Sequence, residues 1–284
     1  MKNIKQLLIV IAISILFTGA YGQNNFSISL SSGYHFGFVP HQFNGINNYE
    51  YVDSITYKVS TGTVFLGNGM EIEGTAHYSI NKNMKINLGI GYLLGEKNYI
   101  RQTYKDSSLR YEIYSNMWLI KPGFSFSFSK NKLIYNATIG SVIALGSVVK
   151  DFHREKKDDV YYEKFEYSGG KGLGLFAEFS INYKLNNKIS FFAKTGADFF
   201  TYMPTEGNIT EAFDNKGTPQ DVLNNIPENL RHETYSNEIT YVNSNTPKEK
   251  LQPYFNMSAF TAQIGITYSI KTFTTKEDRP ATKL

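Results

Sequence analysis

Cysteine is absent from the 284 residues, and tryptophan occurs only once. The missing thiols exclude disulfide bonds, thiolate chemistry and a lipidated N-terminal cysteine. The formal net charge is only +4 and is spread along the chain, which argues against a nucleic-acid-binding stripe and against a polybasic membrane patch. No apolar run reaches the roughly 20 residues that a membrane-spanning helix needs. An exported chain of this kind must therefore be stabilised by something other than disulfides or a helical anchor.

One short apolar run, Leu7 to Phe17, follows Lys2 and Lys5 and precedes the small residues Ala20 and Gly22. This three-part pattern is typical of a secretory signal peptide. We expect the signal peptide to cover residues 1–22, with cleavage near Gly22, before Gln23; a cut after Ala20 is the alternative. A retained membrane anchor is the weaker interpretation, because the run is only about half as long as a spanning helix.

Most of the remaining chain alternates between apolar and polar residues. Three short turns of similar chemistry interrupt this alternation, Asn81-Lys82-Asn83, Lys130-Asn131-Lys132 and Asn186-Asn187-Lys188. Asn tolerates a positive φ and Lys stays hydrated, so such triplets suit tight hairpin turns. Period-two alternation over about ten residues matches a tilted strand that crosses a bilayer. We expect eight strands, near residues 26–38, 70–80, 84–92, 118–129, 135–145, 173–184, 189–199 and 260–270, with the facing of the fourth and fifth left open.

Long polar stretches separate the predicted hairpins, near residues 40–66, 95–111, 150–170 and 204–252. The predicted fold is all-β: an eight-stranded antiparallel up-and-down transmembrane β-barrel with four long extracellular loops and three short periplasmic turns. The barrel is expected to cover residues 23–273 and a periplasmic tail residues 274–284. A soluble β-sandwich is the rival fold. Against it, aromatic residues recur near the short turns as an interfacial girdle requires, at Tyr78, Phe128, Tyr135, Tyr183, Phe191 and Tyr268.

The chain resembles the small bacterial outer-membrane β-barrel proteins, the porin family that includes the OmpA transmembrane domain and OmpX types. Its last predicted strand resembles the signal that is read by the barrel assembly machinery, through Gln263, Gly265, Tyr268 and Ile270, although Ile270 replaces the usual aromatic residue. The resemblance implies a location in the bacterial outer membrane, insertion by that machinery, and contact with outer-membrane lipids and lipopolysaccharide.

The alternation also predicts which charged side chains point into the barrel. They are Glu71, Glu73, His77, Lys85, Lys121, Glu178, Lys184, Lys194 and Asp198. An eight-stranded barrel is only wide enough for side chains to fill it, and buried charges need partners. A salt-bridge network that plugs the lumen is the first interpretation, and a narrow ion path lined by the same groups is the second.

Catalysis and metal binding find little support in the sequence. Glu73, His77 and Ser79 share one strand face, but they lie about 7 and 14 Å apart along it, too far for a direct relay. No histidine has the carboxylate spacing of a metal site, so we expect no enzyme activity, no cofactor and no metal.

The functional hypothesis is a barrel with a filled lumen that anchors long surface loops for contact with the envelope or with a protein partner, and no nucleic acid. The third loop mixes charges with tyrosines, which suits protein recognition, and the fourth is expected to hold a short helix near residues 219–230 that could cap the barrel mouth. The alternative is a small porin-like channel or a component of a secretion machinery.

Overall fold

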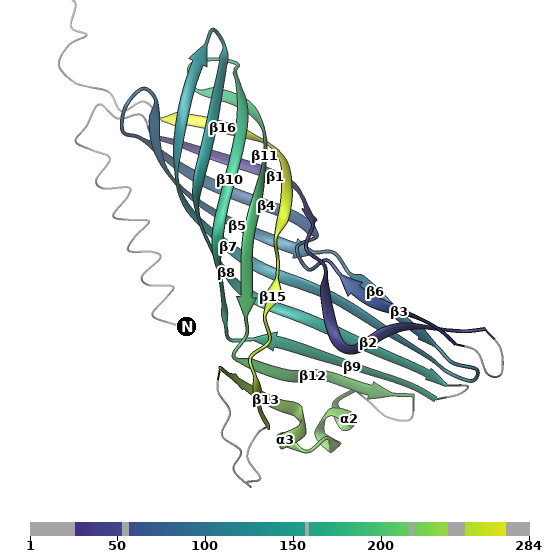
Figure 1. The fold of residues 1–284 in the computed structure, drawn as a ribbon. Coiled ribbons are helices and arrows are strands. Elements are labelled where there is room, and N and C mark those ends of the chain that lie inside the picture. The colour runs from purple at the N-terminus through teal and green to yellow at the C-terminus, as the bar shows by residue number, and fades with distance from the viewer. Residues whose placement is uncertain (1–25, 53–56, 157–158, 216–218, 238–247, 271–284) are drawn as a thin grey trace, which may run out of the picture.

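The computed structural model describes residues 26–52, 57–156, 159–215, 219–237 and 248–270. The predicted signal peptide and the predicted tail at 274–284 lie outside these ranges. The described chain folds into one sheet of sixteen strands and two short helices (Figure 1). The strands are β1 (Phe26–Gly37), β2 (His41–Tyr51), β3 (Tyr57–Val64), β4 (Gly69–Ser79), β5 (Met84–Gly95), β6 (Asn98–Thr103), β7 (Ser108–Lys130), β8 (Leu133–Lys156), β9 (Asp159–Ser168), β10 (Lys171–Lys184), β11 (Ile189–Met203), β12 (Glu206–Asp214), β13 (His232–Ser236), β14 (Lys248–Leu251), β15 (Phe255–Asn256) and β16 (Ala259–Ile270).

Eight of these strands close a ring in the order β1, β4, β5, β7, β8, β10, β11 and β16. The first and last strands of the chain complete it, with Phe26 opposite Ile270 and Gly37 opposite Ala259. Strict alternation turns one set of side chains outward, and this outer set is apolar: Leu30, Leu175 and Ile264 are each more than 60% exposed. Closure satisfies the backbone hydrogen bonds of every strand, which a strand in lipid requires.

The prediction of an eight-stranded up-and-down barrel with four long loops is wrong. The sheet has sixteen strands, and the ring is only part of it. The stretches predicted as long loops form β2 and β3, β6, β9, and β12 to β14. β6 pairs with the far half of β7, and β9 pairs with the far half of β8. The other strands join outside these two and continue the sheet beyond one rim of the ring, in the order β3, β2, β6, β7, β8, β9, β12, β13 and β14 (Figure 1). We call this part the sheet extension.

The extension is built from the far halves of β7 and β8, which are 23 and 24 residues long. A strand needs only about ten residues to cross a bilayer, so half of each strand lies beyond the ring. Proline inside a strand often marks a bulge, but Pro122 lies in β7 without one. The register between β7 and β8 is the same on both sides of it, and in this pairing only positions 121 and 122 of β7 and 141 and 142 of β8 lack partners. On β8 the ambiguity in facing is resolved, because Ile139 is exposed outside while Val142 and Ala144 are buried inside.

The three short turns, the start of β1 and the end of β16 lie at the opposite end of the ring, at the top in Figure 1. The predicted girdle residues lie near this end, and five of them are exposed on the outer surface: Tyr78, Phe128, Tyr183, Phe191 and Tyr268. A second aromatic belt, with Tyr92, Trp118, Phe199 and Phe260, lies nearer the extension. From Phe128 to Trp118 the distance along β7 is roughly 33 Å, or about 25 Å along the axis of a barrel with the usual strand tilt, which is the height of a transmembrane barrel's apolar band.

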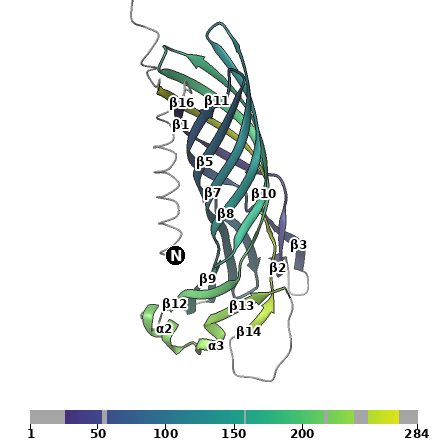
Figure 2. The same cartoon turned by 90° about the vertical axis from the view of Figure 1, so that its left-hand side faces the viewer.

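Two helices, α2 (Pro219–Asn225) and α3 (Glu228–Arg231), occupy the range in which a short helix was expected. They lie beside β12 and β13 at the far end of the extension, away from the mouth of the ring (Figure 2). The expected cap over the mouth is therefore wrong. Within the described ranges, no helix is long and apolar enough to cross a membrane.

Candidate functional site

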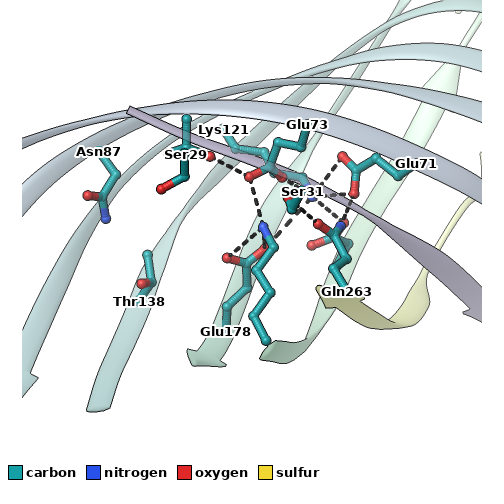
Figure 3. A network of polar contacts seen from close by, with 12 residues as sticks. Ser29, Ser31, Glu71, Glu73, Asn87, Lys121, Thr138, Glu178 and Gln263 are labelled. Atoms are coloured by element: carbon teal, nitrogen blue, oxygen red, sulfur yellow. Dashed lines mark hydrogen bonds and ion pairs between the residues drawn. The ribbon is translucent and has the colours of Figure 1, made fainter. Parts of the chain in front are cut away.

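Six charged side chains meet inside the ring, and we call them the charged cluster: Glu71, Glu73, Lys121, Glu178, Lys194 and Asp198. They come from β4, β7, β10 and β11, strands that are not all neighbours, so the ring itself brings them together. Each occupies an inward position of the alternating pattern. In Figure 3 Glu71, Glu73, Lys121 and Glu178 point toward one another, while Asn87 and Thr138 lie to one side.

Lys121 is the centre of the cluster. Its side chain is 2% exposed, and its Nζ lies 3.0 Å from Asp198 Oδ2, 3.2 Å from Glu71 Oε1, 3.4 Å from Glu73 Oε2 and 3.9 Å from Glu178 Oε1. One ammonium group therefore contacts all four carboxylates. Such an arrangement compensates part of the cost of removing the charges from water.

Lys194 is the second cation of the cluster. Its Nζ donates to Glu73 Oε1 at 2.8 Å and to Glu178 Oε1 at 3.3 Å. Two ammonium groups thus face four carboxylates, and the buried His35 is placed between two of the acids. Its Nε2 lies 2.7 Å from Glu71 Oε2, and its Nδ1 lies 3.9 Å from Asp198 Oδ2.

Uncharged side chains extend the network. Gln263 donates to Glu71 Oε2 and accepts from Ser31 Oγ at 2.8 Å, and Thr75 donates to Glu73 Oε1 at 2.6 Å. These bonds connect β1 and β16 with β4, across the strand pair that closes the ring. The cluster therefore ties the closing strands to the opposite wall.

Between the charged cluster and the extension, the lumen is filled by an apolar core that includes Leu93, Met117, Leu119, Phe200 and Met257. Glycines on neighbouring strands make room for large inward side chains. Phe176 lies against Gly123 and Gly140, and Phe192 lies against Gly265, where an added Cβ would overlap the ring. The charged cluster and the apolar core thus close the lumen at two successive levels, and the two phenylalanine rings also line the cavity toward the short turns.

Toward the short turns the lumen is polar and contains a cavity of about 70 Å³, room for a few waters. His77 contributes to its wall, with Nε2 2.7 Å from Ser29 Oγ and Nδ1 2.7 Å from Asn87 Oδ1. Lys85 also lines the cavity and is half-buried.

The structure brings six of the nine predicted interior residues into one cluster, places His77 and Lys85 in the cavity beside it, and leaves Lys184 exposed at the rim. Of the predicted assembly-signal residues, Gln263 lies in the buried network, Gly265 lies under Phe192, and Tyr268 and Ile270 are exposed on the outer surface. Whether they direct assembly stays a prediction.

His35 and Gln263 belong to the network although they were not among the predicted interior residues, and both fall on the inward side of the period-two pattern. Phe176 and Phe192 were missed because the pattern treats inward residues as polar. Glycines at inward positions on the neighbouring strands were the available signal for them. Among the residues with described positions, no three His, Asp or Glu side chains are arranged to hold a metal ion.

The extension offers a second candidate site, because its two faces differ. The face continuous with the lumen carries three half-exposed rings in a row, which we call the aromatic band: Tyr111, Phe152 and Tyr161. Their centroids lie 5.1 Å and 6.2 Å apart along the row. On the outer face, Glu112 and Asp151 are buried beneath longer side chains, and Lys97 Nζ lies 2.7 Å from Glu112 Oε2 and 3.9 Å from Asp151 Oδ2.

No family model matches this chain, and no curated protein matches it, so the resemblance to the OmpA and OmpX types stays a prediction. Two solved structures are similar to it. One is the outer membrane protease OmpT from Escherichia coli, at 8% identity and a TM-score of 0.25, covering 87% of this chain and 96% of that one. The other is a FadL homologue from Pseudomonas aeruginosa, at 8% identity and a TM-score of 0.20, covering 87% of this chain and 90% of that one.

The expectation that the protein is not an enzyme is contradicted by the first of these similarities, because the matched structure is that of a protease. At this identity and TM-score the similarity transfers no activity to the present chain. What the ring itself establishes is coarser: with an apolar belt outside and a polar and charged lumen inside, the chain is a β-barrel of the outer-membrane type.

Proposed function

We propose that the protein is a sealed outer-membrane barrel that holds a binding sheet outside the cell. The observation that carries this proposal is the sheet extension, in which seven further strands are built on the far halves of β7 and β8. In outer-membrane barrels the short turns face the periplasm and the long connections face outward. By that rule the extension is extracellular, and its size suits recognition of a partner at the surface.

The filled lumen supports a binding role over a passive channel. Lys121 and the four carboxylates occupy the middle of the ring, and the apolar core fills the half nearest the extension. An ion entering from either side meets paired charges or packed side chains. Purified, folded protein in a planar bilayer is therefore expected to give no stepwise conductance, and regular single-channel steps would overturn the sealed-barrel part of the proposal.

The aromatic band supports the lumen-side face of the extension as the binding face. Half-exposed aromatic rings provide contact area at low entropic cost, which is why they are enriched in recognition surfaces. Tyr161 donates to Glu163 Oε2 at 2.9 Å, and the Arg154 guanidinium lies 5.4 Å from the centroid of the Tyr161 ring. Polar groups thus border the band, as they do at the rim of a protein interface.

Because the chain has no cysteine, single-cysteine variants test this assignment cleanly. Phe152→Cys places a thiol on the lumen-side face, and the matched His153→Cys places one on the outer face of the same strand. Both should react with a membrane-impermeant maleimide in intact cells. If a partner covers the aromatic band, position 152 should react more slowly in cells than in the purified protein, relative to position 153. If the ratio of the reaction rates at positions 152 and 153 is the same in cells and in the purified protein, a binding role for this face is refuted.

A further inference from the structure

Six lysines lie at the rim formed by the three short turns. We call them the lysine collar: Lys82, Lys85, Lys130, Lys132, Lys184 and Lys188. In the sequence no turn has more than two of them close by, so the chain shows no polybasic segment. The ring brings all three hairpin ends to one rim, because β4 and β5, β7 and β8, and β10 and β11 each turn at that end (Figure 1). The even spread of charge along the sequence argued against a polybasic patch, but the fold brings these lysines together and creates one.

The collar carries uncompensated positive charge. No ion pair joins any of its six lysines to an acid within the described ranges, and all except Lys85 are exposed. The turns and the strand ends around them contain no Asp or Glu. The nearest acids on the same strands, Glu73 and Glu178, are already paired with Lys121 and Lys194 in the charged cluster. The rim therefore attracts anions from outside the protein.

The collar also lies at the depth where lipid phosphates are found. Its lysines border the aromatic girdle: Lys132 Nζ lies 5.9 Å from the centroid of the Tyr183 ring, and the exposed Lys184 follows Tyr183 on the opposite, lumen-side face of β10. Tyrosines of such girdles lie at headgroup level, and lysine side chains beside them extend to the same layer. The positive charge of Lys82, Lys130, Lys132 and Lys188 is thus distributed around the rim at the boundary between acyl chains and water, while Lys85 and Lys184 lie on the lumen side of the same rim.

We propose that the lysine collar binds the phosphate groups of anionic phospholipids in the leaflet on the short-turn side. A cluster of four to eight lysines beside a membrane span recognises anionic lipid, and each lysine near such a surface favours binding by a factor of about five. The binding is electrostatic and is shared among exposed side chains, so it selects headgroup charge and not a particular headgroup shape. This inference concerns the periplasmic rim and does not depend on what the extension binds.

Lipid selectivity can be measured by tryptophan quenching. The only tryptophan, Trp118, lies in the belt near the extension, so the reporter protein combines Trp118→Phe with Phe191→Trp in the girdle beside the collar. Vesicles contain phosphatidylcholine with increasing brominated phosphatidylglycerol, or the reverse, and quenching gives the relative association constant of the two lipids. We expect roughly a tenfold preference for phosphatidylglycerol, because each lipid headgroup contacts only one or two of the lysines. At about 0.5 M salt, where charges are screened beyond roughly 4 Å, the preference should largely disappear.

The decisive variant replaces Lys82, Lys130, Lys132 and Lys188 with Gln in the reporter protein, and it should reduce the preference to about one. The matched control replaces four exposed cations of the extension, Lys58, Arg101, Lys105 and Lys156, with Gln and should keep the full preference. Folding of both variants is checked by heat-modifiable migration on gels. A reporter protein without preference, or a preference that survives the collar substitutions, would overturn the proposal. So would stronger competition by inorganic phosphate than by chloride at equal ionic strength, because that result would indicate a small-anion site beside Lys85 in place of a lipid surface.

Discussion

Lys121 is the side chain on which the interior charges depend most, since its ammonium group lies between 3.0 and 3.9 Å from four carboxylates. Lys121→Met keeps the length of the side chain but leaves the acids with only Lys194 and His35. We expect a loss of about 3–5 kcal/mol in the free energy of unfolding, the usual cost of removing one partner from a buried ion pair. Urea titration of the protein refolded into lipid vesicles measures it.

Lys105→Met is the control for this substitution, because Lys105 is exposed on the extension. Its unfolding midpoint should match that of the wild type. An unchanged midpoint in Lys121→Met would mean that the cluster is neutralised by protons or ions and does not depend on Lys121.

Gly91 tests how tightly the cluster is held. A Cβ added there would overlap the carboxylate of Glu71 and no backbone atom, so Gly91→Ala must displace that carboxylate from Lys121. The expected loss is about 1–3 kcal/mol, typical of overpacking in a filled interior. On the same measurement Gly74→Ala should be close to neutral, because the space around Gly74 is open. If the Gly91→Ala loss persists undiminished in a Glu71→Ala background, the displacement mechanism is wrong.

At the scale of elements, β6, β7 and β8 beyond the ring hold two acids whose ionisation acts in opposite directions. Burial alone would raise the pKa of Glu112, but Lys97, Arg110 and His153 outweigh it, and the pKa lies below its usual value. Burial raises the pKa of Asp151, and Lys97 offsets this only in part. Ionised Glu112 therefore stabilises the folded extension at neutral pH, whereas ionised Asp151 destabilises it.

The sign of the pH dependence follows from these shifts. The contribution of Glu112 is complete above its ordinary pKa of 4.5 and is lost as the pH falls through the lower folded value. Glu112→Gln should reduce the stability of the extension at pH 7 by about 1 kcal/mol, and Asp151→Asn should increase it. Hydrogen exchange of the β6 and β7 amides measures both. Equal protection in the two variants would contradict the assigned signs.

The strands of the ring could be predicted from the sequence because lipid and lumen demand opposite chemistry on the two faces. The extension could not, because neither face of a strand outside the membrane has to be apolar. On β7, Glu112 and Ile113 are both buried, on opposite faces, and on β9 every residue except the buried Phe165 is half-buried, whichever face it lies on. Alternation then carries no signal, and a strand looks like a polar loop.

The inward facing of the cluster residues was predictable for the same reason, but their pairing was not. Lys121 and Asp198 belong to strands that are not neighbours in the ring, so no spacing along the chain relates them. His35 is a second residue whose facing, but not its partners, could be predicted. Period two turns it inward, but only the closed ring shows that it lies between Glu71 and Asp198.

At the scale of the whole molecule, the two aromatic belts define how deep the barrel lies in the membrane. Trp118 is 54% exposed in the belt near the extension, and its ring centroid lies 5.0 Å from that of Tyr92. In lipid vesicles its fluorescence should be quenched more strongly by bromines near the headgroups than by bromines near the bilayer centre. The wild-type protein needs no substitution for this measurement, because Trp118 is its only tryptophan. Stronger quenching from the bilayer centre would place the extension partly inside the membrane and contradict the described boundary.

The continuity of β7 and β8 from ring to extension also has a mechanical meaning. A force that pulls a bound partner away from the cell acts along these two strands, which are hydrogen-bonded to β5 and β10 inside the ring. The load is then shared in shear by many backbone hydrogen bonds at once, and no single bond has to break first. A surface sheet attached in this way can transmit tension into the membrane without a flexible linker that would unfold or stretch.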